Sequence, residues 1–218
     1  SDFPIDGYGH EYDGDEAFYL LQSVTTDIDA AKTGINNLTI YSGNDYQESQ
    51  LEGLYQAVTG AGRDIDNDGN YTSLGDIEPM NIGWREGALK VILLATDAPF
   101  HDSDIDENYP GAGKTEVINV LQEKGVTVFG LQSGSIGLAT DDLDSIVLAT
   151  KGQTFLLSYD SNEIAAAISS ALDEALKEID LSIEVISGEQ WVETITPVLI
   201  ENVKPNEEVT FEINLKGI

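Results

Sequence analysis

The chain has 218 residues, of which 40 are acidic and 10 basic, so its formal net charge at pH 7 is −30. This charge argues against nucleic acid and anionic membrane surfaces as partners, because both are themselves negatively charged. The lack of cysteine excludes disulfides, thiolate metal sites and a cysteine nucleophile. The self-repulsion favours a setting in which cations bind the protein or salt screens it, such as a calcium-rich extracellular medium.

The first part of the chain predicts a loop followed by two helices. Residues 1–16 are rich in Asp and Gly and show no hydrophobic periodicity, which is typical of a loop. Residues 25–38 predict a helix that Thr25 or Thr26 caps. Its apolar residues share one face: Ile28, Ala31, Ile35 and Leu38. A second helix is predicted over residues 48–59 and ends at the glycine that follows it.

Residues 64–76 carry the pattern of a calcium-binding loop. Three carboxylates at alternating positions of a tight turn converge on one point, and Gly69 supplies the bend. The closing acid comes one residue later than in an EF-hand, and no paired helices flank the loop, so we expect a calcium site outside the EF-hand family. The expected ligands are Asp64, Asp66, Asp68, the carbonyl of Asn70, and Asp76. A solvated acidic turn is the alternative, because acid-rich chains contain some D-x-D-x-D matches by chance.

The middle of the chain alternates between strands and helices. Residues 90–96 contain a continuous apolar run that is typical of a buried parallel strand and too short to cross a bilayer, so no direct membrane insertion is expected. Further helices are predicted over residues 115–124, 141–150 and 160–178, and further strands over residues 126–131 and 153–157. The alternation predicts an α/β fold, a mostly parallel sheet with helices on both faces and the Val91–Thr96 strand central and buried.

The pattern changes near residue 179. Residues 181–186, 193–200 and 208–215 are β-like and are separated by turn residues. In the last of these, Val209, Phe211, Ile213 and Leu215 alternate with polar residues, which predicts a half-buried antiparallel strand. We therefore expect two domains, an α/β domain over residues 1–179 and an all-β appendage over residues 180–218.

Several segments resemble integrin β subunits. Residues 81–85 read NIGWR and precede LKVILLATDAPFH, which is similar to IGWR and an apolar strand ending TTDA in the I-like domain of those subunits. The stretch GNDYQES resembles the family's N-x-D-x-P-E, and DFPIDGYG with the later TTDIDAAKTGINNL resembles the sequence just before it. The resemblance implies a Rossmann-like von Willebrand factor A (VWA) domain over residues 1–179 and half of a hybrid, Ig-like domain over residues 180–218. The lack of cysteine, which animal integrin β chains contain, points to a prokaryotic relative.

The resemblance also implies divalent-metal sites at the carboxyl ends of the strands. Glu48 matches the glutamate of the family's metal-ion-dependent adhesion site, and Asp97 matches the aspartate that ends its fourth strand. Asp45 matches an aspartate of the adjacent calcium site, where Gly43 and Gln47 replace the family's asparagine and proline and one ligand is lost. The implied cofactor is Ca²⁺, with Mg²⁺ as the alternative, since hard cations prefer oxygen ligands. Without the resemblance, Asp97 is an ordinary strand-end residue and Glu48 a helix N-terminal acid.

The chain departs from the family by lacking D-x-S-x-S, the motif on which the adhesion site is founded. We expect the sequence to be a fragment that begins after the strand carrying this motif; a divergent form that has abandoned the site is the alternative. The two histidines, His10 and His101, lie far apart in the sequence. His101 comes just after a strand end and is expected to be a surface residue rather than a metal ligand.

Three functions fit these features. The first is a secreted or surface-displayed calcium-binding module for cell adhesion or ligand binding, with no enzymatic activity. An acidic group of a protein or other ligand would complete its metal shell, or a neighbouring domain would contact it. The second is an acidic scaffold that calcium only stabilises, with no metal-bridged ligand. The third is a metal-dependent hydrolase, for which aligned carboxylates are present but no base or nucleophile is identified.

Overall fold

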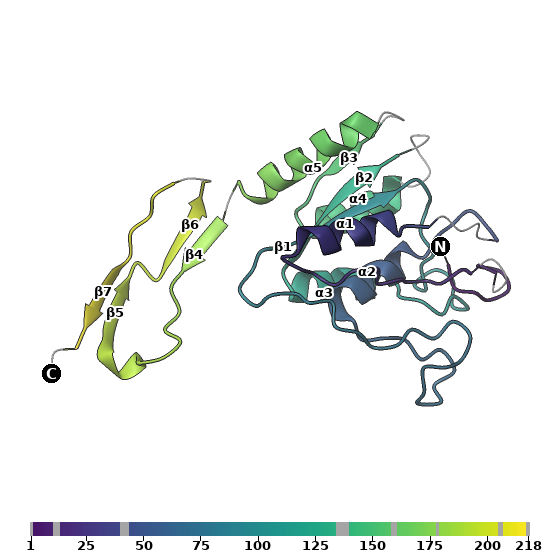
Figure 1. Cartoon of the computed structure of the whole chain (residues 1–218), viewed down its shortest axis with the longest axis horizontal. Helices are drawn as coiled ribbons and strands as arrows, with labels where there is room; N and C mark the ends of the chain where they lie inside the picture. Colours follow the sequence, from purple (N-terminus) through teal and green to yellow (C-terminus); the bar gives the residue numbers. More distant parts are fainter. Residues whose placement is uncertain are drawn as a thin grey trace. The chain divides into compact units, whose positions relative to one another are not determined.

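The computed structural model describes residues 2–10, 14–39, 44–133, 140–157, 161–177, 179–204 and 207–216. The chain forms two compact units, Ser1–Glu163 and Ile164–Ile218. The division falls within the last helix, α5 (Ser161–Ala175), and so lies before the boundary expected near residue 179. The fold is mixed α/β, with a parallel sheet and helices in the first unit and antiparallel strands near the C-terminus (Figure 1).

The first unit contains a three-stranded parallel sheet. Its strands are β1 (Lys90–Thr96), β2 (Val126–Gln132) and β3 (Thr154–Leu156), in the order β1-β2-β3. The two longer strands pair over their full length, from Lys90 opposite Val126 to Thr96 opposite Gln132. Parallel strands need crossover connections, and the helices between these strands provide them. The predicted parallel sheet is therefore confirmed.

The position predicted for the Val91–Thr96 strand is wrong. The central strand is β2, all but one of whose residues are buried, whereas most of β1 is only partly buried. Among the described residues, β1 has β2 as its sole ladder partner. An apolar run indicates that a strand contacts a core, but the neighbours of that strand depend on pairings that the run itself does not encode.

Three helices pack with the sheet into the main core. They are α2 (Gln50–Thr59), α3 (Lys114–Glu123) and α4 (Thr140–Ala149). Each contributes apolar residues at helical spacing, and alternate residues of β2 meet them. The buried residues that these helices and β2 contribute to this cluster are Leu51, Leu54, Val58, Val117, Leu121, Val126, Val128, Leu143, Ile146 and Val147. Helix α2 ends where expected, because Gly60 adopts the left-handed conformation (φ 57°) and donates its N–H to the carbonyl of Gln56.

Helix α1 spans Ile28–Asn36 and begins later than predicted. Its cap is Asp27 rather than Thr25 or Thr26, since the Asp27 carboxylate accepts hydrogen bonds from the two backbone N–H groups of residues 29 and 30. The predicted apolar face is real but largely uncovered, with Ile28 69% and Ile35 66% exposed.

The second unit contains most of α5 and two small antiparallel sheets. Strand β4 (Ile179–Ser182) pairs with β6 (Leu199–Val203), and β5 (Val192–Thr196) pairs with β7 (Glu212–Leu215). The predicted antiparallel character is confirmed. The single strand predicted over residues 193–200 is instead two strands, and the break contains Pro197, which has no N–H to donate to a ladder. The half-burial predicted for the last strand is found only at Val209 and Phe211, which precede β7 and are partly buried; every residue of β7 itself is exposed.

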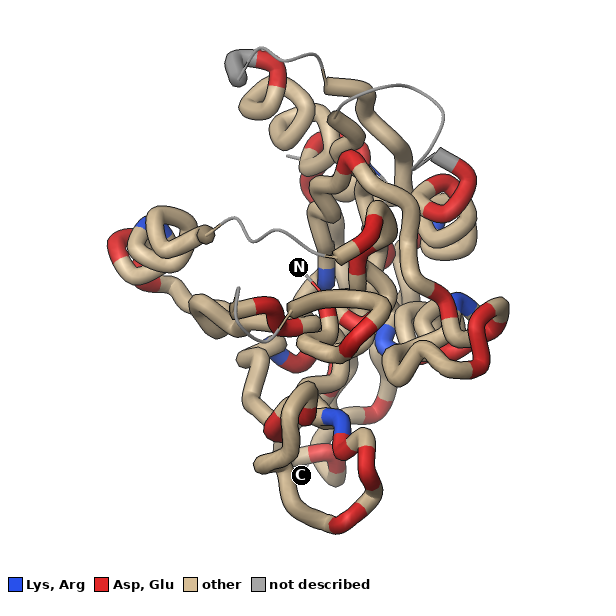
Figure 2. Tube along the Cα trace, turned by 90° about the vertical axis from the view of Figure 1, so that its right-hand side faces the viewer, with Lys and Arg blue, Asp and Glu red and all other residues tan. Residues whose placement is uncertain are grey.

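Acidic residues occur along both units, and basic residues are few (Figure 2). No helix in the described part of the chain is both long enough and apolar enough to span a membrane.

Candidate metal centres

The acidic loop brings its three alternating carboxylates together. One oxygen from each of Asp64, Asp66 and Asp68 lies within 4.8 Å of the other two. Asp64 is partly buried, and the other two are exposed. The convergence follows from the local sequence, since Gly69 takes a positive φ of 85° and allows the turn to close. A set of carboxylate oxygens open to solvent suits a hard cation such as Ca²⁺.

Hydrogen bonds within the loop hold the carboxylates in place. Asp64 accepts the backbone N–H of Gly69 at 2.8 Å, and Asp68 accepts that of Asn70 at 2.7 Å. The Ser73 hydroxyl donates to Asp66 Oδ2 at 2.7 Å, and this bond is the main reason that the pKa of Asp66 is lowered. The loop therefore favours the charged form of Asp66, the form that binds a metal.

Asp76, the fifth expected ligand, makes hydrogen bonds of its own within the loop, and its role as a calcium ligand stays a prediction. Its two carboxylate oxygens accept the backbone N–H groups of Ile65 at 3.0 Å and Ser73 at 2.9 Å. It therefore braces the two sides of the loop, and it is not among the three residues that converge. The predicted role of the Asn70 carbonyl stays a prediction; the residue is adjacent to the converging carboxylates through its N–H bond to Asp68.

The base of the loop is connected to the core. Arg63 and Ile77 form an antiparallel bridge, with N–H to carbonyl distances of 2.7 and 2.8 Å. The Arg63 guanidinium lies 2.8 Å from Oε2 of Glu52, a fully buried residue of α2. Burial lowers the pKa of Arg63, but the Glu52 carboxylate more than offsets this and raises it. A buried ion pair thus fixes where the loop leaves the core of the first unit.

A second cluster joins three segments that are distant in the sequence. Nε2 of His101 lies 2.8 Å from Oδ2 of Asp2 and 3.3 Å from Oδ1 of Asp45. These donor atoms all lie within 4.8 Å of one another. The expectation that His101 is a surface residue is wrong, because its side chain is only 5% exposed. No local pattern could reveal this cluster, since it depends on the tertiary fold that brings residues 2, 45 and 101 together.

The surroundings of this cluster orient Asp2 and His101. Asp2 Oδ1 accepts the backbone N–H of Phe3 at 2.9 Å and the hydroxyl of Ser49, which in turn accepts the Tyr109 hydroxyl at 2.8 Å. The His101 ring stacks on the Tyr109 ring at a centroid distance of 4.9 Å and meets the Tyr8 ring edge-on at 4.9 Å. Burial lowers the pKa of His101, but Asp2 and then Asp45 outweigh it, and the net effect is a raised pKa.

The residues matched to the integrin adhesion site are brought near the end of β1. Glu48 forms a parallel bridge with Phe100, in which the Glu48 N–H donates to the Pro99 carbonyl at 3.0 Å. The backbone of Glu48 therefore lies beside the segment that directly follows Asp97. Neither residue belongs to the two groups of three metal-capable side chains found in the described ranges. The approach of their two carboxylates stays a prediction.

The adjacent calcium site implied by the resemblance is only partly described. Gly43 lies outside the described residues, and Gln47 is exposed. Asp45 does join a group of possible metal ligands, but its companions are Asp2 and His101 rather than the neighbours that the resemblance implies.

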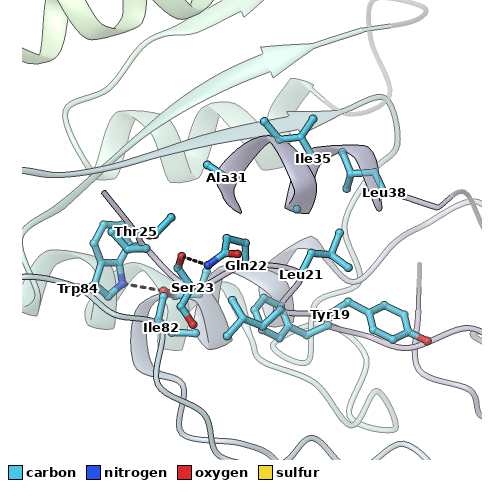
Figure 3. A pocket seen from close by; sticks show the side chains of 15 residues that line it. Tyr19, Leu21, Gln22, Ser23, Thr25, Ala31, Ile35, Leu38, Ile82 and Trp84 are labelled. Atoms are coloured by element: carbon cyan, nitrogen blue, oxygen red, sulfur yellow. Dashed lines mark hydrogen bonds between the residues drawn. The ribbon is translucent and has the colours of Figure 1, made fainter. Parts of the chain in front are cut away.

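A pocket of about 560 Å³ lies beside α1 (Figure 3). Its lining is mainly apolar and comes from residues 18–25, the apolar face of α1, and the segment around Trp84. Trp84 is fixed by a hydrogen bond from its indole N–H to the Ala57 carbonyl at 2.8 Å. The apolar face predicted for residues 25–38 therefore lines a pocket through Ala31, Ile35 and Leu38.

No protein-family model matches this chain, and no curated protein matches it. Among solved structures, the chain is similar to proximal thread matrix protein 1 from the mussel byssus, with a TM-score of 0.44 and 18% sequence identity. The match covers 76% of this chain and 34% of that protein, so this chain spans about a third of its length. Similarity at this level does not assign a family or a function.

Proposed function

We propose that this chain is a calcium-binding, extracellular or cell-surface module for adhesion or ligand binding, and that it is not an enzyme. The observation that carries the proposal is the convergence of Asp64, Asp66 and Asp68 within a loop whose glycine and internal hydrogen bonds favour that geometry. Three ionised carboxylates held together repel one another, and a dication removes that repulsion. The net charge of −30 causes similar repulsion over the whole molecule, which bound cations would reduce.

The finer proposal is that the first unit is a Rossmann-like VWA domain similar to the integrin β I-like domain. Its support is the parallel sheet together with the position of the Glu48 backbone beside the chain that follows β1. In open α/β sheets, ligands bind beyond the carboxyl ends of the strands. A Ca²⁺ or Mg²⁺ held there by Glu48 and Asp97 would accept an acidic group of a protein partner.

A calcium-stabilised scaffold without a bridged ligand is the second candidate. Two observations favour it: Asp76 braces the loop backbone, and Arg63 links the loop base to buried Glu52. Both connect calcium binding to folding rather than to a partner.

Isothermal titration calorimetry on the whole chain separates the two candidates. The adhesion module predicts two classes of calcium sites, one removed by Asp66→Asn and the other by the pair Glu48→Gln and Asp97→Asn. The scaffold predicts the first class alone. Binding that none of these substitutions changes would overturn both, because the calcium would then reside on surface carboxylates elsewhere.

A further inference from the structure

We propose that Asp2, Asp45 and His101 form a second metal centre, which takes a divalent transition metal of the zinc class rather than calcium. This centre shares no residue with the acidic loop, and it does not depend on the function proposed above. It unites an imidazole and two carboxylates from three separate segments, a donor set typical of protein sites for such metals.

The state of the two buried donor atoms favours a bound metal. His101 Nε2 and Asp2 Oδ2 form an ion pair at 2.8 Å, both atoms are buried from solvent, and neither has a hydrogen bond of good geometry to any other described group. The Asp2 side chain is 1% exposed and that of His101 is 5% exposed. Buried polar atoms without aligned partners are uncommon in native proteins and call for a physical reason. A metal ion that both atoms contact would supply one.

The surroundings of the cluster leave the required donor atoms available. Both the Phe3 N–H and the Ser49 hydroxyl donate to Asp2 Oδ1, so Oδ2 is the oxygen turned toward His101. The Tyr109 hydroxyl extends this chain of hydrogen bonds by donating to Ser49. Hydrogen-bonded support of this kind orients metal ligands and increases affinity.

The distances and the charge of the cluster suit an ion of the zinc class. Ligand atoms about 2.0–2.2 Å from a tetrahedral zinc ion lie roughly 3.3–3.5 Å apart. The His101–Asp45 separation of 3.3 Å already meets this requirement, and the His101–Asp2 separation of 2.8 Å needs a small opening. A dication also balances the two carboxylates beside a neutral imidazole. Asp45 is 30% exposed, which provides a route for the metal and leaves room for a water ligand.

The imidazole decides between metals. Calcium prefers an all-oxygen shell of six to eight ligands, whereas zinc-class ions readily accept nitrogen in four-coordinate sites. The three converging carboxylates of the acidic loop offer only oxygen donors. The loop should therefore bind calcium, and the cluster with His101 should bind a zinc-class ion.

The test is calorimetric titration of the untagged whole chain with Zn²⁺ in the presence of saturating Ca²⁺. We expect one zinc ion per chain, and we expect His101→Gln and Asp45→Asn each to weaken binding by more than about tenfold, the lower end of what loss of a supporting residue costs. The chain has only two histidines, so His10→Gln is the matched control and should bind zinc as the wild type does. Asp66→Asn should also leave zinc binding unchanged.

Side-chain nitrogen NMR supplies a readout that does not depend on variants folding. Zinc should shift the ring-nitrogen resonances of His101 and leave those of His10 in place. The proposal is overturned if zinc does not bind in the micromolar range, if binding persists unchanged in Asp45→Asn, or if the His101 resonances do not respond. In each of these cases, His101 and Asp2 form only a buried ion pair.

Discussion

Single residues decide how the acidic loop is held. Arg63 begins the loop and also pairs with Glu52, whose carboxylate accepts the Gln56 side-chain amide at 2.7 Å and the Ala112 N–H at 2.8 Å. This carboxylate is completely buried, so its charge depends on the guanidinium and on those donors. The loop geometry and the core of the first unit are thereby coupled through one ion pair.

We predict that Arg63→Ala lowers the free energy of unfolding by about 3–5 kcal/mol, because it leaves the Glu52 charge buried and unpaired. Urea denaturation measures the change. Arg85→Ala is the control, since Arg85 is exposed and its loss should cost less than about 0.5 kcal/mol. Adding Glu52→Gln to Arg63→Ala should recover part of the loss. Equal effects of the Arg63 and Arg85 substitutions would show that the pair contributes nothing.

Two glycines provide a matched test of the loop turn. A Cβ would meet no atom within 4 Å at either Gly69 or Gly53, but Gly69 has a φ of 85° and Gly53 lies within α2. We expect Gly69→Ala to destabilise the protein by about 1–2 kcal/mol through backbone strain. Gly53→Ala should stabilise it by roughly 0.5–1 kcal/mol, since alanine favours a helix. Thermal unfolding curves recorded without calcium measure both changes in stability. Equal shifts of the melting temperature in the two variants would contradict the turn geometry.

How much the sequence predicts also differs from residue to residue. The converging carboxylates of residues 64–68 were predictable, because a short loop with a glycine specifies its own geometry. The approach of Asp2 and His101 was not predictable, because the two residues lie far apart in the sequence and no periodicity reports such distant contacts. Tyr8 and Asp106, which are hydrogen-bonded in the same region, are likewise 98 positions apart. Spacing alone does not show that the Asp76 carboxylate accepts two backbone N–H groups, and its role as a calcium ligand stays a prediction.

At the scale of elements, the N-terminus of α3 depends on the loop before it. Its cap residue is Gly113, which has no side chain, and the first N–H groups are satisfied from elsewhere. Asp102 accepts the Lys114 N–H at 2.9 Å, and Asp104 accepts the Thr115 N–H at 2.7 Å. Negative charge is favourable at this end of a helix.

We predict that Asp104→Ala destabilises the protein at pH 7 by about 0.5–2 kcal/mol, the usual cost of a lost cap. Hydrogen bonds from Thr115 hold the pKa of Asp104 below its ordinary value of 3.8. Because the pKa is lower in the folded state, the ionised carboxylate contributes stability at pH values above its unfolded-state pKa. That contribution is lost as the pH falls through the folded-state pKa. The difference from wild type should therefore persist down to about pH 4 and shrink below it. Denaturation at several pH values tests this, with exposed Glu123→Ala at the other end of α3 as the control.

Most elements were predictable because their period is local. The bounds of β1, β2 and α2 follow from apolar runs, helical spacing and the glycine after α2. The order of the strands was not predictable, and β2 rather than β1 is central, because strand neighbours are chosen by long-range packing. Pro197 indicates that the segment predicted as one strand over residues 193–200 forms two strands, since proline is rare within a ladder.

At the scale of the whole molecule, 40 acids on 218 residues make stability dependent on cations. Monovalent salt screens such repulsion in general, whereas a specific site responds to one ion at low concentration. The two effects are separable if the ionic strength is held constant while calcium is varied. Any stabilisation that remains then reports binding to the folded state.

Calcium binding by Asp64, Asp66 and Asp68 underlies the proposed function. Its most direct test is differential scanning calorimetry with and without Ca²⁺ at constant ionic strength, on the wild type and on Asp66→Ala. Calcium at 100 times its Kd should add about 2.7 kcal/mol and raise the Tm by roughly 5–10 °C. Asp66→Ala should lose most of that increment while folding normally without calcium, because Asp66 is exposed. No calcium-dependent shift in the wild type, or an equal shift in Asp66→Ala, would show that the loop is only a solvated acidic turn.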